Sequence, residues 1–354
     1  MNETIYRELA EHLDQLPGGF APSETGAEIP LLQRLFTPEQ AELAILLTLD
    51  PENAAAIAQK ANLSADETQK RLEEMAQRGL IFAIYPDEGP TLYKAVPFVV
   101  GIYEFQVNRL SPELRQDLSD YWRTQKPRER KPAIPQMRTI PVEQGIETRL
   151  QALPYEQATQ LVEEQDRFAV APCICRQHAK LVGGGCDAPE ETCLMFGEWA
   201  DFYVKGGMGR SIDKDEVLEI LAKADVANLV LQPTNSQHAS AMCCCCGCCC
   251  GILNGYKRHP KPAEAVASAF IAAFDADLCT GCWTCLDRCQ MEALTENGDH
   301  VAFNADRCIG CGLCVSTCPG GALTLERKPQ SAETEIPETF NDTWVTITRM
   351  QAEE

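Results

Sequence analysis

The distribution of cysteine constrains this chain more than any other feature of its sequence. All 19 cysteines lie between Cys173 and Cys318, and none precedes Cys173. Disulfides alone could not pair an odd number of thiols, and in a reducing compartment thiols at this density act first as metal ligands. We therefore expect the second half of the chain to fold around metal centres.

Eight of these cysteines form an internal repeat at 279–318. Each run has the spacing Cys-x2-Cys-x2-Cys-x3-Cys, and the second run starts 29 residues after the first. Three closely spaced thiolates suit three corners of a four-iron cube, whose fourth corner needs a thiolate from elsewhere. A pair of zinc ribbons would explain the Cys-x2-Cys units but not the fourth cysteine of each run. The runs are Cys279, Cys282, Cys285 and Cys289, then Cys308, Cys311, Cys314 and Cys318.

The repeat resembles the bacterial two-cluster ferredoxin over residues 275–328. The resemblance implies two [4Fe-4S] clusters, each bound by three cysteines of one run and the last cysteine of the other. One cluster would bind Cys279, Cys282, Cys285 and Cys318, and the other would bind Cys308, Cys311, Cys314 and Cys289. The sequence departs from the motif at Gln290, where the family has proline, while Pro319 keeps it. We expect Gln290 to leave the ligands intact and to loosen the loop of the first run.

A denser group of cysteines lies upstream, where residues 242–251 read MCCCCGCCCG. Neighbouring cysteines are poor disulfide partners, because a disulfide needs Cα atoms about 5.5 Å apart. An extended strand would place alternate sulfurs on opposite faces, and Gly247 and Gly251 would let the chain bend around a metal centre. We expect one or two further iron–sulfur clusters here, with a zinc–thiolate site as the alternative. The candidate ligands are Cys173, Cys175, Cys186, Cys193, Cys243, Cys245, Cys246, Cys248, Cys249 and Cys250, and their spacing does not assign them to particular centres.

Helical and strand patterns alternate around these cysteines, which predicts a cysteine-rich α/β domain over 142–262. Cys173 and Cys175 are expected on one face of a strand. Residues 194–205 and 213–225 are expected to form helices, and residues 227–233 a strand. The small residues of 264–274 predict a helix at the start of a ferredoxin-like domain over 263–328.

Residues 37–122 resemble the winged helix-turn-helix domains of bacterial regulators. Thr37 and Ser64 have the spacing of capping-box N-caps, and residues 80–85 and 91–96 read as a hairpin. An amphipathic helix and linker at 1–36 precede this domain, and a basic, proline-rich linker at 123–141 follows it. Residues 37–100 contain five basic and ten acidic side chains, whereas a DNA-binding surface needs several cations on phosphates. We expect this domain to pack or to contact protein, with DNA an unlikely partner.

The net charge of the whole chain limits the kinds of partner that it can bind. Acidic residues number 52 and basic residues 31, giving a formal charge of −21 that disfavours nucleic acid and anionic membranes. The N-terminus lacks a secretory apolar region and no stretch is long enough to span a bilayer, so we expect a cytoplasmic protein. An acidic tail at 329–354 completes an α+β multidomain chain, and this tail is either loose or held along the body by Trp344.

The middle segment and the repeat together resemble iron–sulfur-binding proteins of anaerobes, some of which carry an N-terminal winged helix. This resemblance implies single-electron transfer to or from an oxidoreductase or flavoprotein partner in anaerobic metabolism. No complete nucleotide, flavin or hydrolase motif is present, so we expect an electron carrier or electron-transfer subunit rather than a stand-alone enzyme. Two alternatives stay open: a redox-sensing transcription regulator, and an oxidoreductase subunit with thiol or disulfide chemistry at Cys248, Cys249 or Cys250.

Overall fold

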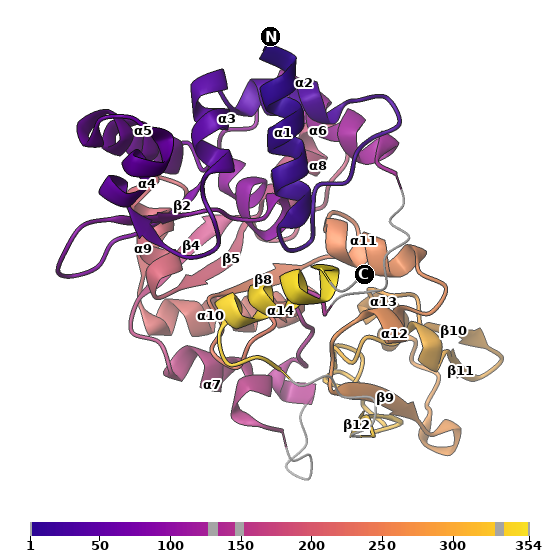
Figure 1. Cartoon of the computed structure of the whole chain (residues 1–354). Helices are drawn as coiled ribbons and strands as arrows, with labels where there is room; N and C mark the ends of the chain where they lie inside the picture. The colour runs from indigo at the N-terminus through magenta and orange to yellow at the C-terminus, as the bar shows by residue number, and fades with distance from the viewer. Residues whose placement is uncertain (1, 127–133, 146–151, 330–335, 353–354) are drawn as a thin grey trace. The chain divides into compact units, whose positions relative to one another are not determined.

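The computed structural model describes residues 2–126, 134–145, 152–329 and 336–352 (Figure 1). It divides into two compact units, Met1–Gln136 with Glu198–Arg210 and Trp344–Glu354, and Met137–Gly197 with Ser211–Thr343. All the cysteines belong to the second unit. The mixture of helices and strands agrees with the predicted α+β class. The finer domain boundaries and the winged-helix assignment stay predictions, and part of the basic linker, 127–133, lies outside the described residues.

The first unit combines helices with one small antiparallel sheet. Thr37 and Gln40 form a complete capping box at the start of the third helix. At the start of the fifth helix, the Ser64 side chain accepts a hydrogen bond from the Glu67 amide. The sheet has the order β1-β3-β2. The elements are α1 (Asn2–Gln15), α2 (Glu28–Leu35), α3 (Pro38–Ile45), β1 (Glu52–Asn53), α4 (Ala54–Ala61), α5 (Ala65–Gln77), β2 (Phe82–Ile84), β3 (Leu92–Lys94), α6 (Pro112–Thr124) and α9 (Glu198–Lys205).

The acidic tail contains a helix, α14 (Phe340–Ala352). Trp344 on this helix is only 1% exposed, and its indole N–H donates to Gln136 Oε1 at 2.7 Å. Its ring lies against Trp199, with ring centres 6.1 Å apart. Of the two possibilities expected for the tail, the structure shows attachment through Trp344.

The second unit contains a five-stranded sheet of order β6-β4-β5-β8-β7, in which the pairs β4–β5, β5–β8 and β8–β7 are antiparallel. Leu161, Val170, Leu194, Val217 and Met242 belong to its buried core. The elements are α7 (Ala158–Glu163), β4 (Phe168–Pro172), α8 (Ile174–Leu181), β5 (Glu191–Phe196), β6 (Arg210–Ile212), α10 (Lys214–Val226), β7 (Val230–Pro233), β8 (Ala241–Cys245) and α11 (Gly251–Arg258).

The repeat segment, residues 263–328, follows in the same unit and shows its duplication in the backbone. The 3-10 turns Ala276–Leu278 and Ala305–Arg307 lie just before the two cysteine runs, with the same 29-residue offset. The first and last strands of the segment pair with each other, and the middle two form a hairpin. The elements are α12 (Pro262–Ala265), β9 (Phe270–Phe274), α13 (Thr284–Arg288), β10 (Leu294–Asn297), β11 (His300–Phe303) and β12 (Leu323–Arg327).

Three sequence predictions of secondary structure are wrong. The helix expected over 264–274 is the end of α12 followed by β9, because pairing with β12 outweighs the helix propensity of its alanines. Cys173 and Cys175 do not share a strand: β4 ends at Pro172, Cys173 is the N-cap of α8, and Cys175 lies within that helix. Residues 194–196 are the end of β5, and Gly197, with φ of +54°, separates them from α9.

Candidate metal centres

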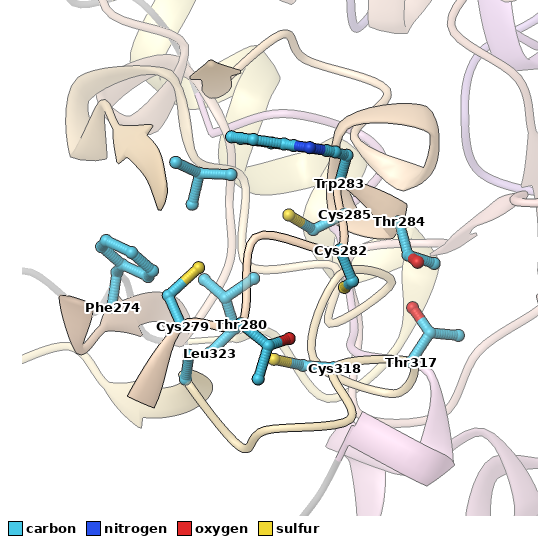
Figure 2. Close-up of a pocket in the computed structure, with 12 residues that line it drawn as sticks. Phe274, Cys279, Thr280, Cys282, Trp283, Thr284, Cys285, Thr317, Cys318 and Leu323 are labelled. Carbon is cyan, nitrogen blue, oxygen red and sulfur yellow. The ribbon is translucent and has the colours of Figure 1, made fainter. Parts of the chain in front are cut away.

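Four cysteines line one pocket of the repeat segment, and this pocket is partly open to solvent (Figure 2). Phe274, Trp283 and Leu323 form apolar parts of its wall. Burial, together with the neighbouring thiols of the other three, raises the pKa of one of these cysteines, Cys285, to about 11. The fold therefore brings together three cysteines of the first run and one of the second: Cys279, Cys282, Cys285 and Cys318.

The remaining four cysteines of the repeat gather in the same crossed way. Burial is the main cause that raises the pKa values of Cys308, Cys311 and Cys314, and the thiol of Cys289 raises all three further. For Cys311 the pKa rises to about 12. Such thiols stay protonated near pH 7 unless a cation stabilises the thiolate, which a bound metal cluster does. Both sets of four cysteines thus fit thiolate ligation of a cationic metal group.

Backbone amides supply further stabilisation for sulfur charge in the second set. The Ala272 N–H donates to Cys308 Sγ at 3.4 Å, and the Ala293 N–H donates to Cys289 Sγ at 3.2 Å. Hydrogen bonds to ligand sulfurs favour the more negative, reduced state of an iron–sulfur cluster. These two amides are placed by β9 and by the loop before β10.

Glycine is required at equivalent places in the two cysteine loops. Gly281 and Gly310 have φ of +65° and +70°, in the left-handed region that disfavours other residues. A Cβ on Gly281 would lie 2.6 Å from the Asp299 carbonyl oxygen, and one on Gly310 would lie 2.1 Å from that of Phe270. The backbone can therefore pass tightly around each set of sulfurs only with glycine at these positions.

Two residues further on, the two loops differ in the residue that adopts the left-handed conformation. Trp283 has φ of +61°, whereas its repeat equivalent, Gly312, has φ of +71°. We expect Trp283→Gly to relieve about 1 kcal/mol of backbone strain and to remove the aromatic wall of the pocket. Oxygen and water would then reach the sulfurs, so the protein should bleach severalfold faster in air, measured by the decay of visible absorbance.

Trp283→Phe is the control, because it keeps an aromatic wall and should bleach at close to the parental rate. Equal rates in the parental protein, Trp283→Gly and Trp283→Phe would contradict the covering role of Trp283.

Gln290, the departure from the ferredoxin motif, contacts the upstream cysteine-rich stretch. Its Oε1 accepts a hydrogen bond of 2.7 Å from the amide of Gly247, within the upstream cysteine-rich stretch. A Cβ on Gly247 would lie 2.7 Å from the Gln290 carbonyl oxygen, so this close contact also needs glycine. The sequence did not indicate this contact, through which the glutamine side chain binds the neighbouring cysteine loop.

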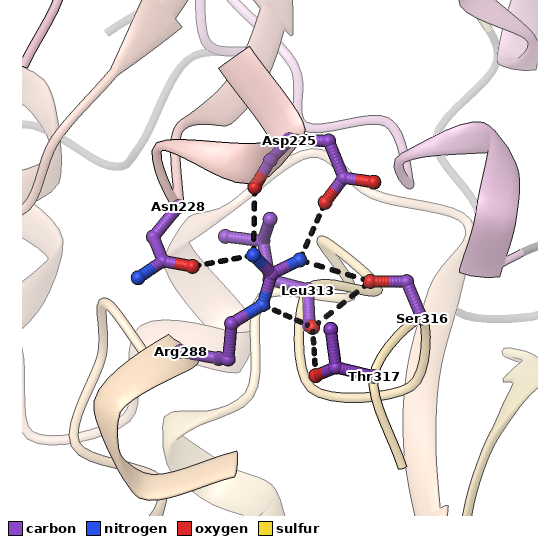
Figure 3. A network of polar contacts seen from close by, with 6 residues as sticks. All are labelled: Asp225, Asn228, Arg288, Leu313, Ser316 and Thr317. Atoms are coloured by element: carbon purple, nitrogen blue, oxygen red, sulfur yellow. Dashed lines mark hydrogen bonds and ion pairs between the residues drawn. The ribbon is translucent and has the colours of Figure 1, made fainter. Parts of the chain in front are cut away.

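Arg288 connects both cysteine runs to the end of α10 (Figure 3). All five of its N–H groups donate: Nε to Leu313 O at 2.9 Å, Nη1 to Asn228 Oδ1 at 2.5 Å and Asp225 O at 2.7 Å, and Nη2 to Ser316 Oγ at 2.9 Å and the Asp225 carboxylate. The side chains of Arg288 and Asp225 are 9% and 14% exposed, so this ion pair is largely buried. Because Arg288 directly precedes Cys289, the network positions the cysteine that crosses to the second set.

The ten candidate ligands upstream separate into two groups. The tetrathiol group consists of Cys186, Cys246, Cys248 and Cys249, whose Sγ atoms all lie within 4.8 Å of one another. The Sγ–Sγ distances are 3.7 Å for Cys186–Cys246, 3.6 Å for Cys248–Cys249 and 3.8 Å for Cys186–Cys249. Cys248 is exposed and Cys246 is buried, so the group extends from the surface inward.

The hexathiol group contains the other six candidates. Cys193 of β5 lies directly opposite Cys243 of β8, and Cys245 follows on the same face of that strand. A neighbouring thiol is the main cause that raises the pKa of Cys243 (through Cys193) and of Cys245 (through Cys243). Cys250 interacts with both Cys175 and Cys245, and Cys175 raises the pKa of Cys173. The members are Cys173, Cys175, Cys193, Cys243, Cys245 and Cys250.

Cys244 belongs to neither group. It lies between Cys243 and Cys245 on β8, so its side chain points to the opposite face of the sheet. It is 1% exposed, and burial raises its pKa to about 12. We therefore treat it as a buried apolar residue of the core.

Sequence reasoning missed Arg176, a buried cation beside both thiol groups. It is 1% exposed, and its guanidinium donates to the carbonyls of Pro189 and Cys244, each at 2.9 Å, and to Thr192 Oγ1 at 2.5 Å. Burial lowers its pKa, but the thiols of Cys173, Cys246 and Cys245 outweigh this and raise it. In turn, burial would raise the pKa of Cys246, but Arg176 and the Cys249 amide lower it to about 7. An arginine inside a Cys-x-Cys-Arg sequence is the signal that could have indicated it.

Comparison with known proteins supports part of this picture. Residues 271–319 match the family described as the 4Fe-4S dicluster domain, a segment that includes both cysteine runs of the repeat. The chain therefore carries an iron–sulfur domain of ferredoxin type. No curated protein and no solved structure matches the chain. Among the described residues, no helix is both long and apolar enough to cross a membrane.

Proposed function

We propose that this protein transfers single electrons through two [4Fe-4S] clusters bound by the repeat segment. The observation that carries this is the pocket that collects Cys279, Cys282 and Cys285 from one run with Cys318 from the other, within a segment matching the dicluster family. A bound [4Fe-4S] cluster takes up and releases one electron at a time. Each set of four thiolates would hold one cluster. Trp283 would cover the cluster of the first set, and the Ala272 and Ala293 amides donate to sulfurs of the second set.

We further propose an additional iron–sulfur cluster in the hexathiol group. This group offers more than the four thiolates that one cubane needs, and it draws them from β4–α8, β5, β8 and the start of α11. Arg176 supplies a fixed positive charge nearby, which would partly offset the negative charge of a cluster and its ligands. Because the group has six cysteines and one cubane needs four, more than one choice of four ligands is compatible with it.

The proposed partner is an oxidoreductase or flavoprotein with a basic docking surface. The formal charge of −21 favours such a partner over nucleic acid, and the association should weaken with salt. We propose that residues 37–122 form a winged helix used for protein packing. Three of its cations are paired or buried and so are not available to DNA phosphates. Arg71 pairs with Glu67, and Arg78 donates to Gln40 and the Leu35 carbonyl. Lys94 is only 4% exposed.

Iron and sulfide analysis of anaerobically purified protein tests these proposals. We expect acid-labile sulfide, low-temperature EPR signals from the reduced protein, and more than the roughly eight irons that two four-iron clusters require. Iron beyond these eight would come from a cluster in the hexathiol group, which lies outside the segment that matches the family. An iron content near eight would refute the additional cluster alone. Colourless protein without acid-labile sulfide would refute electron transfer through the repeat.

A further inference from the structure

We infer that the tetrathiol group is a separate site for one zinc ion, bound tetrahedrally by Cys186, Cys246, Cys248 and Cys249. This goes beyond the proposed electron-transfer function, since zinc carries no electron and the site shares no cysteine with the proposed clusters. The inference rests on the distances between the four sulfur atoms.

The spacing of the sulfurs matches a single ion. Four thiolates around zinc with bonds of about 2.3 Å form a tetrahedron whose edges are about 3.8 Å long. The three Sγ–Sγ distances that link this group are 3.6, 3.7 and 3.8 Å, and no pair exceeds 4.8 Å. The four sulfurs thus already stand close to the corners that zinc requires.

The same spacing argues against a four-iron cube at this position. In a cubane each thiolate binds a different iron, so its ligand sulfurs are separated by the width of the cluster and two further bonds. Four sulfurs that all lie within 4.8 Å of one another leave no such space. They are not disulfides either, because all four cysteines are free and a disulfide needs sulfurs about 2.0 Å apart.

The ligands come from two segments that the ion would join. Cys186 follows the glycine loop after α8, where Gly183 and Gly185 have φ of +79° and +106°. The other three ligands occupy the turn from β8 into α11, around Gly247. A closed, thiolate-only site of this kind is typical of structural zinc, which holds loops together without redox chemistry. Here it would fix the turn that also carries Cys245 and Cys250 of the hexathiol group.

The charge around the site is suited to a doubly charged cation with four thiolates, a complex with net charge −2. Arg176 is the buried cation whose charge acts on Cys246, and the Cys249 amide donates toward the same sulfur. Both interactions lower the cost of placing that negative complex beside a hydrophobic core. Cys248 is exposed, so the ion has a path from solvent.

Zinc content and X-ray absorption of the full-length, anaerobically purified protein test the inference. We expect one zinc per chain, with four sulfur neighbours at about 2.3 Å. Cys249→Ser should reduce zinc to near zero while the EPR signals of the repeat persist. Cys244→Ala is the matched control from the same stretch, outside both thiol groups, and should retain the zinc. If Cys249→Ser folds poorly, Cys248→Ser provides a second test: this ligand is exposed, and its replacement should also remove the zinc.

Three results would overturn the zinc site. These are the absence of zinc from parental protein that contains its iron and sulfide, the loss of four irons instead of one zinc from Cys249→Ser, and the binding of a single iron by the four thiolates. The EPR signals and sulfide content of the repeat are measured separately, so failure of the zinc site and failure of the electron-transfer function give different results.

Discussion

Cys318→Ala should abolish the EPR signal of the cluster bound mainly by the first cysteine run, although Cys318 itself belongs to the second. The reason is that Cys318 lines the same pocket as Cys279, Cys282 and Cys285. Removing one of four thiolates leaves an iron corner without its ligand, so the four-iron cluster is lost from that set. Cys289→Ala should do the converse, because Cys289 lies with Cys308, Cys311 and Cys314.

The pairing can be tested without assigning any signal in advance. Cys318→Ala and Cys282→Ala should remove one and the same EPR signal, and Cys289→Ala and Cys311→Ala should both remove the other. Each variant should lose about half of the repeat's iron and sulfide. If Cys318→Ala instead matched Cys311→Ala, each run would hold its own cluster and the crossed arrangement would be wrong. Cys244→Ala, which removes a thiol outside all these sets, should leave both signals intact.

Much of the repeat segment follows from its sequence because the constraints there are local. Two Cys-x2-Cys-x2-Cys-x3-Cys runs at a fixed offset impose nearly the same loop twice, and Gly281 and Gly310 mark its left-handed backbone. The helix expected over 213–225 is present as α10, and the strand expected over 227–233 contains β7. Local signals such as caps, glycines and apolar spacing were sufficient for these elements.

The grouping of the upstream cysteines depends instead on tertiary structure. Cys193 and Cys243 meet because β5 and β8 pair in one particular register, which no local pattern encodes. In the same way, β9 is a strand because β12, some fifty residues later, pairs with it. The ten candidate ligands can therefore be identified from the sequence, but their division into four and six cannot, nor can the positions of Arg176 and Arg288 beside the cysteines.

Arg288→Met should produce the largest loss of stability of any single change that leaves the ligands in place. The substitution keeps an apolar stem but removes the Arg288 hydrogen bonds from the Asp225 carboxylate, Asn228 Oδ1 and Ser316 Oγ. The Asp225 side chain is only 14% exposed. Removing one partner of a buried ion pair costs about 3–5 kcal/mol, because the remaining charge stays unpaired. We expect a much lower melting temperature under anaerobic conditions, together with selective weakening of the EPR signal that Cys289→Ala removes.

Two further variants decide whether the unpaired charge is the cause. Arg71→Met is the matched surface control, since the Arg71–Glu67 pair is far more exposed, at 27% and 47%, and such pairs contribute about 0–1 kcal/mol. Arg288→Met combined with Asp225→Leu removes both charges and should recover part of the lost melting temperature, because two apolar partners leave no buried ion. If the double variant melts no higher than Arg288→Met, the stability lost comes from the carbonyl and hydroxyl acceptors of the two cysteine loops. If Arg288→Met melts like Arg71→Met, Arg288 does not join the loops in solution, and Cys289 must be positioned by its own run.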